Sequence, residues 1–182
     1  MVSDIQDEIV KFNIASNTGS STIFEPTNSW YETFADLSFH KTEEIKCSRI
    51  DDILYKQFNT TFLESIKFLV IDIEGAELKA LKSMGSLIDK VEFAFVEVSL
   101  RPNFHNAPLM IDIDKFFFKH SFKKIYLKYG SASGDALYKR VNKLSIIHIY
   151  ITLFLDKLLQ MLSTLRITDQ VSKIKNIIKK II

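Results

Sequence analysis

The chain has 182 residues, of which 47% are hydrophobic and 25% are charged, and its formal net charge is +2. This length suffices for one domain with a well-formed core plus an appendage, and it disfavours two full domains. The nearly balanced charge gives no argument for a nucleic-acid partner.

The single cysteine, Cys47, excludes an intramolecular disulfide and suits a reducing compartment. We interpret it as a small, half-buried strand residue. Residues 1–7 lack a basic start followed by an apolar core, so we predict no secretory signal and a cytoplasmic location. The charge-free apolar stretch at residues 144–155 would span about 18 Å as a helix, against about 30 Å of bilayer hydrocarbon, which disfavours a membrane-spanning helix.

The first predicted elements are a strand, a loop, an aromatic segment and a second strand. Residues 8–15 alternate apolar and polar side chains, which predicts a strand. Residues 16–22 are turn formers and predict an exposed loop, in which Ser21 either binds a substrate or simply belongs to the loop. Residues 23–39 are rich in aromatic side chains that either cover a substrate or, as we favour, pack on the sheet edge. Residues 42–48 alternate weakly and predict another strand.

Residues 49–58 predict a short amphipathic helix with acids near its start. Residues 68–71 are four apolar residues without polar alternation, a pattern typical of a strand covered on both faces of a parallel sheet. We therefore expect this strand to be central. A helix-forming run follows from Ala76, and Gly85 is suited to a left-handed cap at its end.

Residues 91–98 predict a second buried strand, with Glu97 near its carboxyl end. One helix fits between the two buried strands, which is the spacing of a crossover between parallel neighbours. Asp72, directly after the first of these strands, and Glu97 should therefore open onto the same edge of the sheet.

The remaining pattern predicts a helix at residues 109–120 and an antiparallel hairpin of residues 122–129 and 135–141. From residue 142 onward there is no glycine or proline, and leucine and isoleucine dominate. We divide the chain into residues 1–141 and an amphipathic helical extension at residues 142–182. The lysines of that extension permit contact with a membrane surface, although packing on the body or on a partner helix is favoured.

Acidic residues at the end of the first buried strand are the candidate catalytic groups. Ligands of open α/β sheets bind beyond the carboxyl ends of the strands, where Asp72 and Glu74 stand. A carboxylate in the position of Asp72 is expected to lose hydration, and it either holds Mg²⁺ or acts as general base toward a substrate hydroxyl. Glu74 either joins that chemistry or caps the following helix. Glu77 is interpreted as structural, since a first-turn acid gains about 0.3–1 kcal/mol from the helix dipole.

Three further residues are candidates for binding the substrate, together with Ser21. Glu97 contributes to the site or serves as the partner of a nearby basic residue. Arg101 and His105 lie in the polar loop at residues 99–108, which follows the second buried strand. A lone loop histidine is more often structural than catalytic, so His105 is placed with the substrate contacts.

Residues 71–77, Ile-Asp-Ile-Glu-Gly-Ala-Glu, and the following Leu81 resemble the Asp-x-Glu-Gly-x-Glu motif of the FkbM family of S-adenosylmethionine-dependent methyltransferases. The surrounding order agrees with a serine-rich loop at Ser20 and Ser21, a short acidic helix at Asp51 and Asp52, and a strand ending in Glu97 and Val98. The resemblance covers about residues 10–140.

The resemblance implies an α/β, Rossmann-like methyltransferase fold and transfer of a methyl group from S-adenosylmethionine, usually to a hydroxyl of a sugar or related metabolite. It implies that the strands leading to Asp72 and Glu97 are the fourth and fifth of the sheet, and that the final hairpin closes it. The family's cofactor site is built chiefly by a first strand, a Gly-rich turn and an acid ending the second strand. None of the five glycines has the spacing or context of such a turn, so no cofactor-binding residue is assigned.

The sequence therefore predicts an incomplete Rossmann-like sheet, the carboxyl-terminal half of a methyltransferase domain with a different tail. Two hypotheses follow. The chain belongs to an active methyltransferase, as a fragment or with its missing half on another chain, or it is an inactive remnant that acts as an interaction module through its C-terminal helices. In both cases an open sheet edge favours self-association, a partner chain, or covering by residues 142–182.

Overall fold

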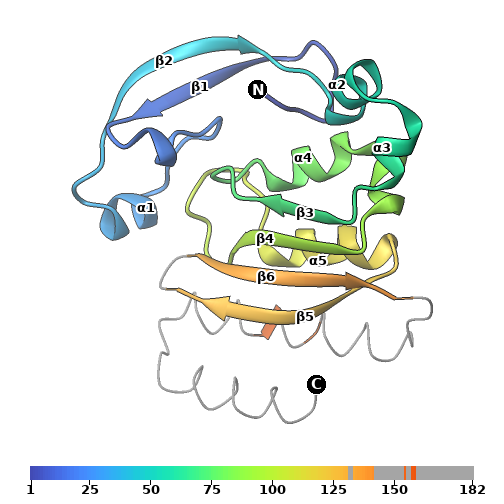
Figure 1. Cartoon of the computed structure of the whole chain (residues 1–182). Helices are drawn as coiled ribbons and strands as arrows, with labels where there is room; N and C mark the ends of the chain where they lie inside the picture. The colour runs from blue at the N-terminus through green and yellow to red at the C-terminus, as the bar shows by residue number, and fades with distance from the viewer. Residues whose placement is uncertain (131–132, 142–153, 155–156, 159–182) are drawn as a thin grey trace.

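The part of the chain that the structure describes contains two β-sheets that share no strand (Figure 1). The structure is a computed structural model, and it describes residues 1–130, 133–141, 154 and 157–158. The strands are β1 (Ile9–Ala15), β2 (Phe39–Lys46), β3 (Phe68–Ile71), β4 (Phe93–Ser99), β5 (Phe122–Tyr129) and β6 (Ser133–Arg140). The helices are η1 (Thr18–Ser20), α1 (Asn28–Thr33), α2 (Ile50–Gln57), α3 (Thr60–Glu64), α4 (Glu77–Ser83), η2 (Gly85–Lys90) and α5 (Met110–Lys119).

The larger sheet has the strand order β3-β4-β6-β5. β3 and β4 are parallel, as expected of a crossover that contains α4, and Ile71 lies opposite Val96. β6 pairs antiparallel with both β4 and β5, so the predicted parallel pair and closing hairpin are confirmed. Gly85 has a φ of +51°, which confirms the expected left-handed position after α4.

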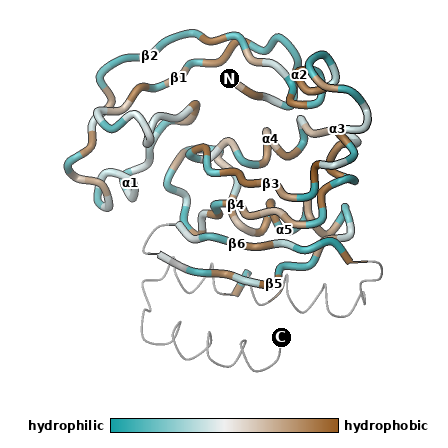
Figure 2. Tube along the Cα trace, in the orientation of Figure 1, coloured by the Kyte–Doolittle hydropathy of each residue, from teal (hydrophilic) through white to brown (hydrophobic). Residues whose placement is uncertain are grey.

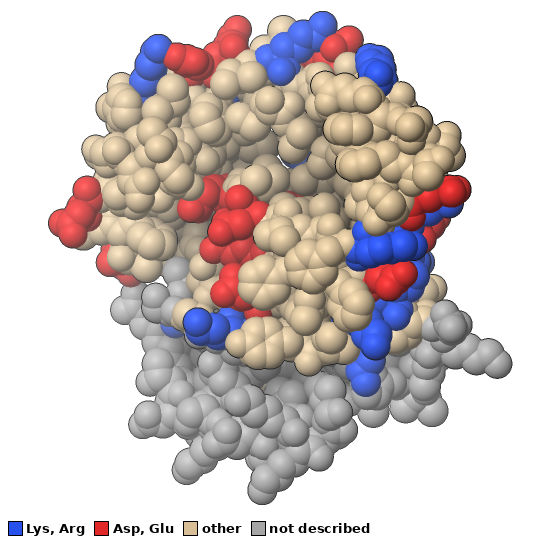
Figure 3. Space-filling model, viewed as in Figure 1, with Lys and Arg blue, Asp and Glu red and all other residues tan. Residues whose placement is uncertain are grey.

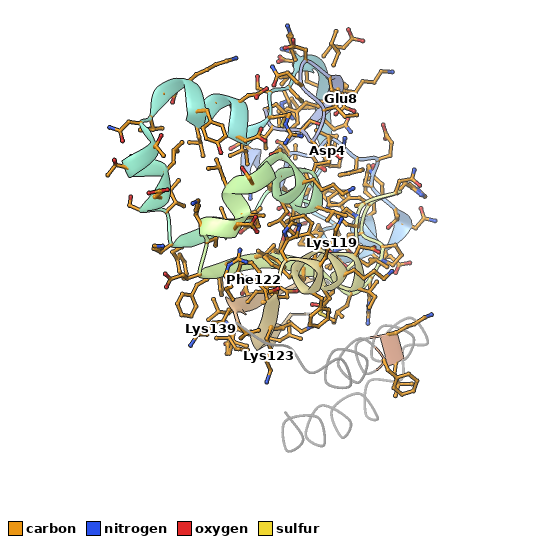
Figure 4. The ribbon with its side chains drawn as sticks, turned by 90° about the vertical axis from the view of Figure 1, so that its right-hand side faces the viewer. Asp4, Glu8, Lys119, Phe122, Lys123 and Lys139 are labelled. Atoms are coloured by element: carbon orange, nitrogen blue, oxygen red, sulfur yellow. The ribbon has the colours of Figure 1, made fainter. Side chains whose placement is uncertain are left out.

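The core lies on the side of this sheet that α4 and α5 cover (Figures 1 and 4). Alternate residues of β4, namely Ala94, Val96 and Val98, are buried there, as the two-residue period of a strand requires. Phe117 of α5 stacks on Tyr138 of β6 with 4.0 Å between ring centroids. Figure 2 shows the hydrophobic character concentrated along β3 and β4.

The expectation that β3 is central and covered on both faces is wrong for the described chain. β3 is an edge strand that pairs only with β4. Phe68 and Val70, which point away from α4, are 56% and 62% exposed. The four apolar residues correctly predicted a strand without polar side chains. Whether the second face of that strand is buried depends on neighbouring elements, which these four residues do not specify.

β1 and β2 form an antiparallel ribbon beside the larger sheet (Figure 1). β2 starts at Phe39, earlier than predicted. Cys47, just past β2, is fully buried rather than half-buried, and burial raises the pKa of its thiol. The ribbon is attached to α4 by Lys79, whose Nζ lies 3.0 Å from a carboxylate oxygen of Glu8 and 3.4 Å from Asp4 (Figure 4).

The aromatic segment serves packing, as favoured, but its central ring does not lie on the edge of the larger sheet. Trp30 is 1% exposed and contacts the rings of Phe39 in β2 and Phe104 in the loop after β4. The segment therefore joins the ribbon to that loop.

The predicted helical extension at residues 142–182 lies outside the described residues, except that residues 154 and 157–158 are helical. None of the helices in the described part of the chain has the length and apolarity needed to cross a bilayer.

Candidate functional site

The chain turns sharply between β3 and α4, where the sequence places its acidic motif. Asp72 follows the last residue of β3, and Glu74 and Gly75 have positive φ angles of +52° and +97°. A Cβ at Gly75 would lie 3.3 Å from ring atoms of both Phe24 and Phe104. Glycine is therefore needed at this position for its backbone angle and for the room it leaves.

Glu77 holds this turn from inside the protein. Its side chain is almost fully buried, and its Oε1 accepts hydrogen bonds from the backbone N–H groups of Ile73 and Gly75, each at 3.1 Å. Burial raises the pKa of Glu77, while these backbone hydrogen bonds act in the opposite direction. The structural interpretation of Glu77 agrees with this geometry, although the acid acts on the turn rather than only on the helix dipole.

The polar loop before α1 holds the same turn from outside. Thr22, which is 1% exposed, donates its hydroxyl proton to the carbonyl oxygen of Glu74 at 2.7 Å. Ser21 instead accepts a hydrogen bond from the backbone N–H of Ala15, which closes its own loop. Sequence reasoning selected Ser21 and missed Thr22, because the contact depends on how the loop is placed against β3.

Glu74 and Glu97 are half-buried carboxyl groups of the described chain whose pKa values are raised to about 7. Burial raises the pKa of Glu74 to about 7, and the charge of Glu97 adds to that effect. Burial likewise raises the pKa of Glu97 to about 7, with further contributions from Asp72 and Asp135 and an opposing hydrogen bond from Ser133.

Asp72 differs from what its position predicted. Its side chain is exposed rather than desolvated, because β3 is an edge strand and the turn carries Asp72 to the surface. It still lies close enough to raise the pKa of both Glu74 and Glu97. Asp72 therefore belongs to the acidic group, but burial is a property of its neighbours Glu74 and Glu97. Figure 3 shows acidic atoms gathered on this face of the molecule.

Asp135 is an acidic neighbour that sequence reasoning missed. It lies directly opposite Glu97 because β6 pairs with β4 in that register. No local pattern reveals such a pairing, since β5 separates the two strands along the chain.

Arg101 and His105 occupy the loop between β4 and α5, as predicted. The backbone N–H of His105 donates to the carbonyl of Glu25 at 2.8 Å, and its side chain is exposed. Within the described residues, neither side chain makes a hydrogen bond or ion pair with the acids. The structure thus brings together the acids of the two parallel strands, and the loop residues lie outside that group.

No group of three or more His, Cys, Asp or Glu side chains in the described chain is arranged to hold a metal ion. The structure thus gives no support to the Mg²⁺ ligand role considered for Asp72.

An α/β sheet with a parallel pair, a closing antiparallel hairpin and acids at the strand ends is compatible with a methyltransferase-like fold. The sequence model of the methyltransferase FkbM domain matches residues 3–124, and the chain therefore belongs to this family of methyltransferases. The match includes the acidic turn and Glu97, and it ends before β6. Neither the curated proteins nor the solved structures gave a match.

Proposed function

We propose that the chain takes part in methyl transfer from S-adenosylmethionine to a hydroxyl group of a sugar or related metabolite. Family membership supports the reaction class, and the acceptor class follows from the family resemblance. The observation that carries the chemical role is the pair of carboxyl groups, Glu74 and Glu97, whose pKa values are both about 7 at the end of a parallel strand pair.

A carboxylate with this pKa is well suited to take a proton at neutral pH. We assign that role to Glu74, which the turn fixes in position, with Glu97 and Asp72 as acceptor contacts. In this role the carboxylate of Glu74 would accept the proton that the acceptor hydroxyl loses when it is methylated. Arg101, His105 and Ser21 stay as candidate acceptor contacts farther from this pair.

The residues of the described chain do not fit a complete cofactor site. Their glycines at positions 75 and 85 form the turn and the helix cap described above, and they do not have the spacing of a Gly-rich cofactor turn. The chain therefore provides the acceptor side of the reaction in this proposal. The alternative, an inactive remnant acting through residues 142–182, depends on residues outside the described part.

The test measures transfer of labelled methyl from S-adenosylmethionine to a panel of hydroxylated sugars, together with calorimetric binding of the cofactor. Turnover is expected to rise with pH through an apparent pKa near 7. Glu74→Gln is expected to lower turnover by about 10²–10⁴-fold, the usual contribution of a general base. Glu92→Gln, an exposed acid just before β4, is the matched control and should keep full activity.

Absence of transfer at millimolar cofactor, both from the chain alone and from the chain mixed with the missing cofactor-binding half of a methyltransferase domain, would refute the proposal. Equal losses in the Glu74 and Glu92 variants would refute the assignment of Glu74 alone.

A further inference from the structure

The side of the larger sheet that faces away from α4 and α5 is apolar and is not covered by any helix of the described chain; we call it the open face. Residues that are paired across neighbouring strands point to the same side of a sheet. The pairing register therefore defines rows of side chains that run across the strands on the open face. The middle row contains Val70, Phe95, Leu137 and Tyr126. Val70 is 62% exposed and Tyr126 is 50% exposed. Most α/β sheets cover both faces, so this surface is suited to a partner.

The two flanking rows carry opposite charges on β6. One row contains Phe68, Phe93 and the lysines Lys139 and Lys123, which lie toward the same end of the sheet (Figure 4). The other row contains Glu97 and Asp135, with Lys128 at its outer end. Figure 3 shows the apolar surface between acidic atoms on one side and basic atoms on the other.

We propose that the open face is a self-association surface, through which two copies of the chain pack face to face with their strands antiparallel. The partner is a second copy because the surface is complementary to itself. A two-fold axis across the middle row puts that row against its own counterpart, as an isologous interface requires. The same rotation brings Lys139 of one copy toward Asp135 of the other.

Charge selects this orientation among the ways of stacking two such faces. If the strands ran parallel across the contact, the row that contains Glu97 and Asp135 would face the same acidic row of the other copy, and like charges would repel. In the antiparallel arrangement the basic row of β6 in each copy faces the acidic row of β6 in the other copy, at both ends of the contact. Two sheets packed in this way leave about 10 Å between their backbones, which apolar side chains of the middle row can fill.

This inference does not rest on the proposed function. The turn with Asp72 and Glu74 lies beyond the last residue of β3 and therefore outside the contact, whereas Glu97 lies at its rim. A chain without methyl transfer can still form the dimer, and a monomeric chain can still be tested for transfer.

The first experiment is sedimentation equilibrium of the full chain over a range of concentrations. A monomer–dimer equilibrium is expected. Val70→Glu places a charge in the middle row at an exposed position, so it should fold normally and shift the protein to the monomer. Ile9→Glu is the matched control, since Ile9 is 67% exposed on the separate ribbon, and it should leave the dimer intact.

The second experiment exchanges charges across the proposed contact. Lys139→Glu and Asp135→Lys are each expected to weaken association at least tenfold, and the double variant should recover most of that loss. Recovery requires that the two positions face each other between copies. The following results would overturn the proposal: a monomer at all concentrations, including one that binds only another polypeptide; a dimer insensitive to Val70→Glu; or single-variant losses that add without recovery.

Discussion

The pKa values of Glu74 and Glu97 make the stability of the folded chain depend on pH. Each carboxyl has a pKa of about 7 in the folded chain, against an ordinary value of 4.5. Between these values the folded state keeps protons that the unfolded state has lost, so stability falls as pH rises. The stabilisation is fully present below the unfolded pKa and is lost as pH rises through about 7.

The size of the effect follows from the same values. The difference between about 7 and 4.5, at about 1.4 kcal/mol per pKa unit, gives an upper limit of about 3.5 kcal/mol for each group. Both side chains are partly exposed, so solvent screening reduces the expected loss to about 1–2 kcal/mol for the two groups together. Asp7 and Glu8 have lowered pKa values, so their contribution is lost only at more acidic pH.

Urea unfolding followed by tryptophan fluorescence measures this loss, because Trp30 is the single tryptophan and is buried. The free energy of unfolding should fall between about pH 5 and about pH 8. Glu97→Gln removes one titrating group and its repulsion on Glu74, so the fall should be smaller than in the wild type. Glu92→Gln, at an exposed position, should keep the wild-type slope. A wild-type stability that is flat or rises over this range, or an unchanged slope in Glu97→Gln, would refute the reasoning.

Three further variants test how the acidic turn and the sheet are held, each by urea unfolding. Glu77→Ala removes the acceptor of two backbone N–H groups and is expected to cost about 2–4 kcal/mol, whereas Glu77→Gln, which keeps an acceptor oxygen, should cost less. Gly75→Ala forces a side chain into a left-handed position against two rings and should cost about 1–3 kcal/mol. Arg140→Lys loses the fork that bonds the carbonyls of Val91 and His120, so it should cost about 1–3 kcal/mol. Losses below about 0.5 kcal/mol would contradict the contact concerned.

The elements of the larger sheet could be predicted because their signals are local. The apolar run of β3, the alternation of β4 and the glycines near residue 130 each lie within a few residues of the element that they specify. The pairing of Glu97 with Asp135 could not be predicted, since it depends on β6 lying between β4 and β5. The exposure of β3 depends in the same way on tertiary neighbours.

The same distinction between local signals and tertiary neighbours explains which properties of the candidate site could be predicted. The sequence indicated which carboxylates follow the strands, but not which of them lose water. Asp72 comes directly after β3 and is exposed, whereas Glu97 lies within β4 and is half-buried beside other acids. Titration near neutral pH arises from surroundings that meet only in the folded chain.

The residues of the acidic motif form one turn, and different residues have different roles in it. Glu77 binds the backbone on one side of the turn, and Thr22 binds the carbonyl of Glu74 on the other. Gly75 supplies the backbone angle that neither contact could impose on a residue with a side chain. Two members of the motif therefore position the turn, which leaves Asp72 and Glu74 for the substrate. Thr22, which is distant from Glu74 in the sequence and pairs with Asn13 of β1, also couples the ribbon of β1 and β2 to the acids. Displacement of that ribbon should therefore disturb Glu74 before it disturbs the core.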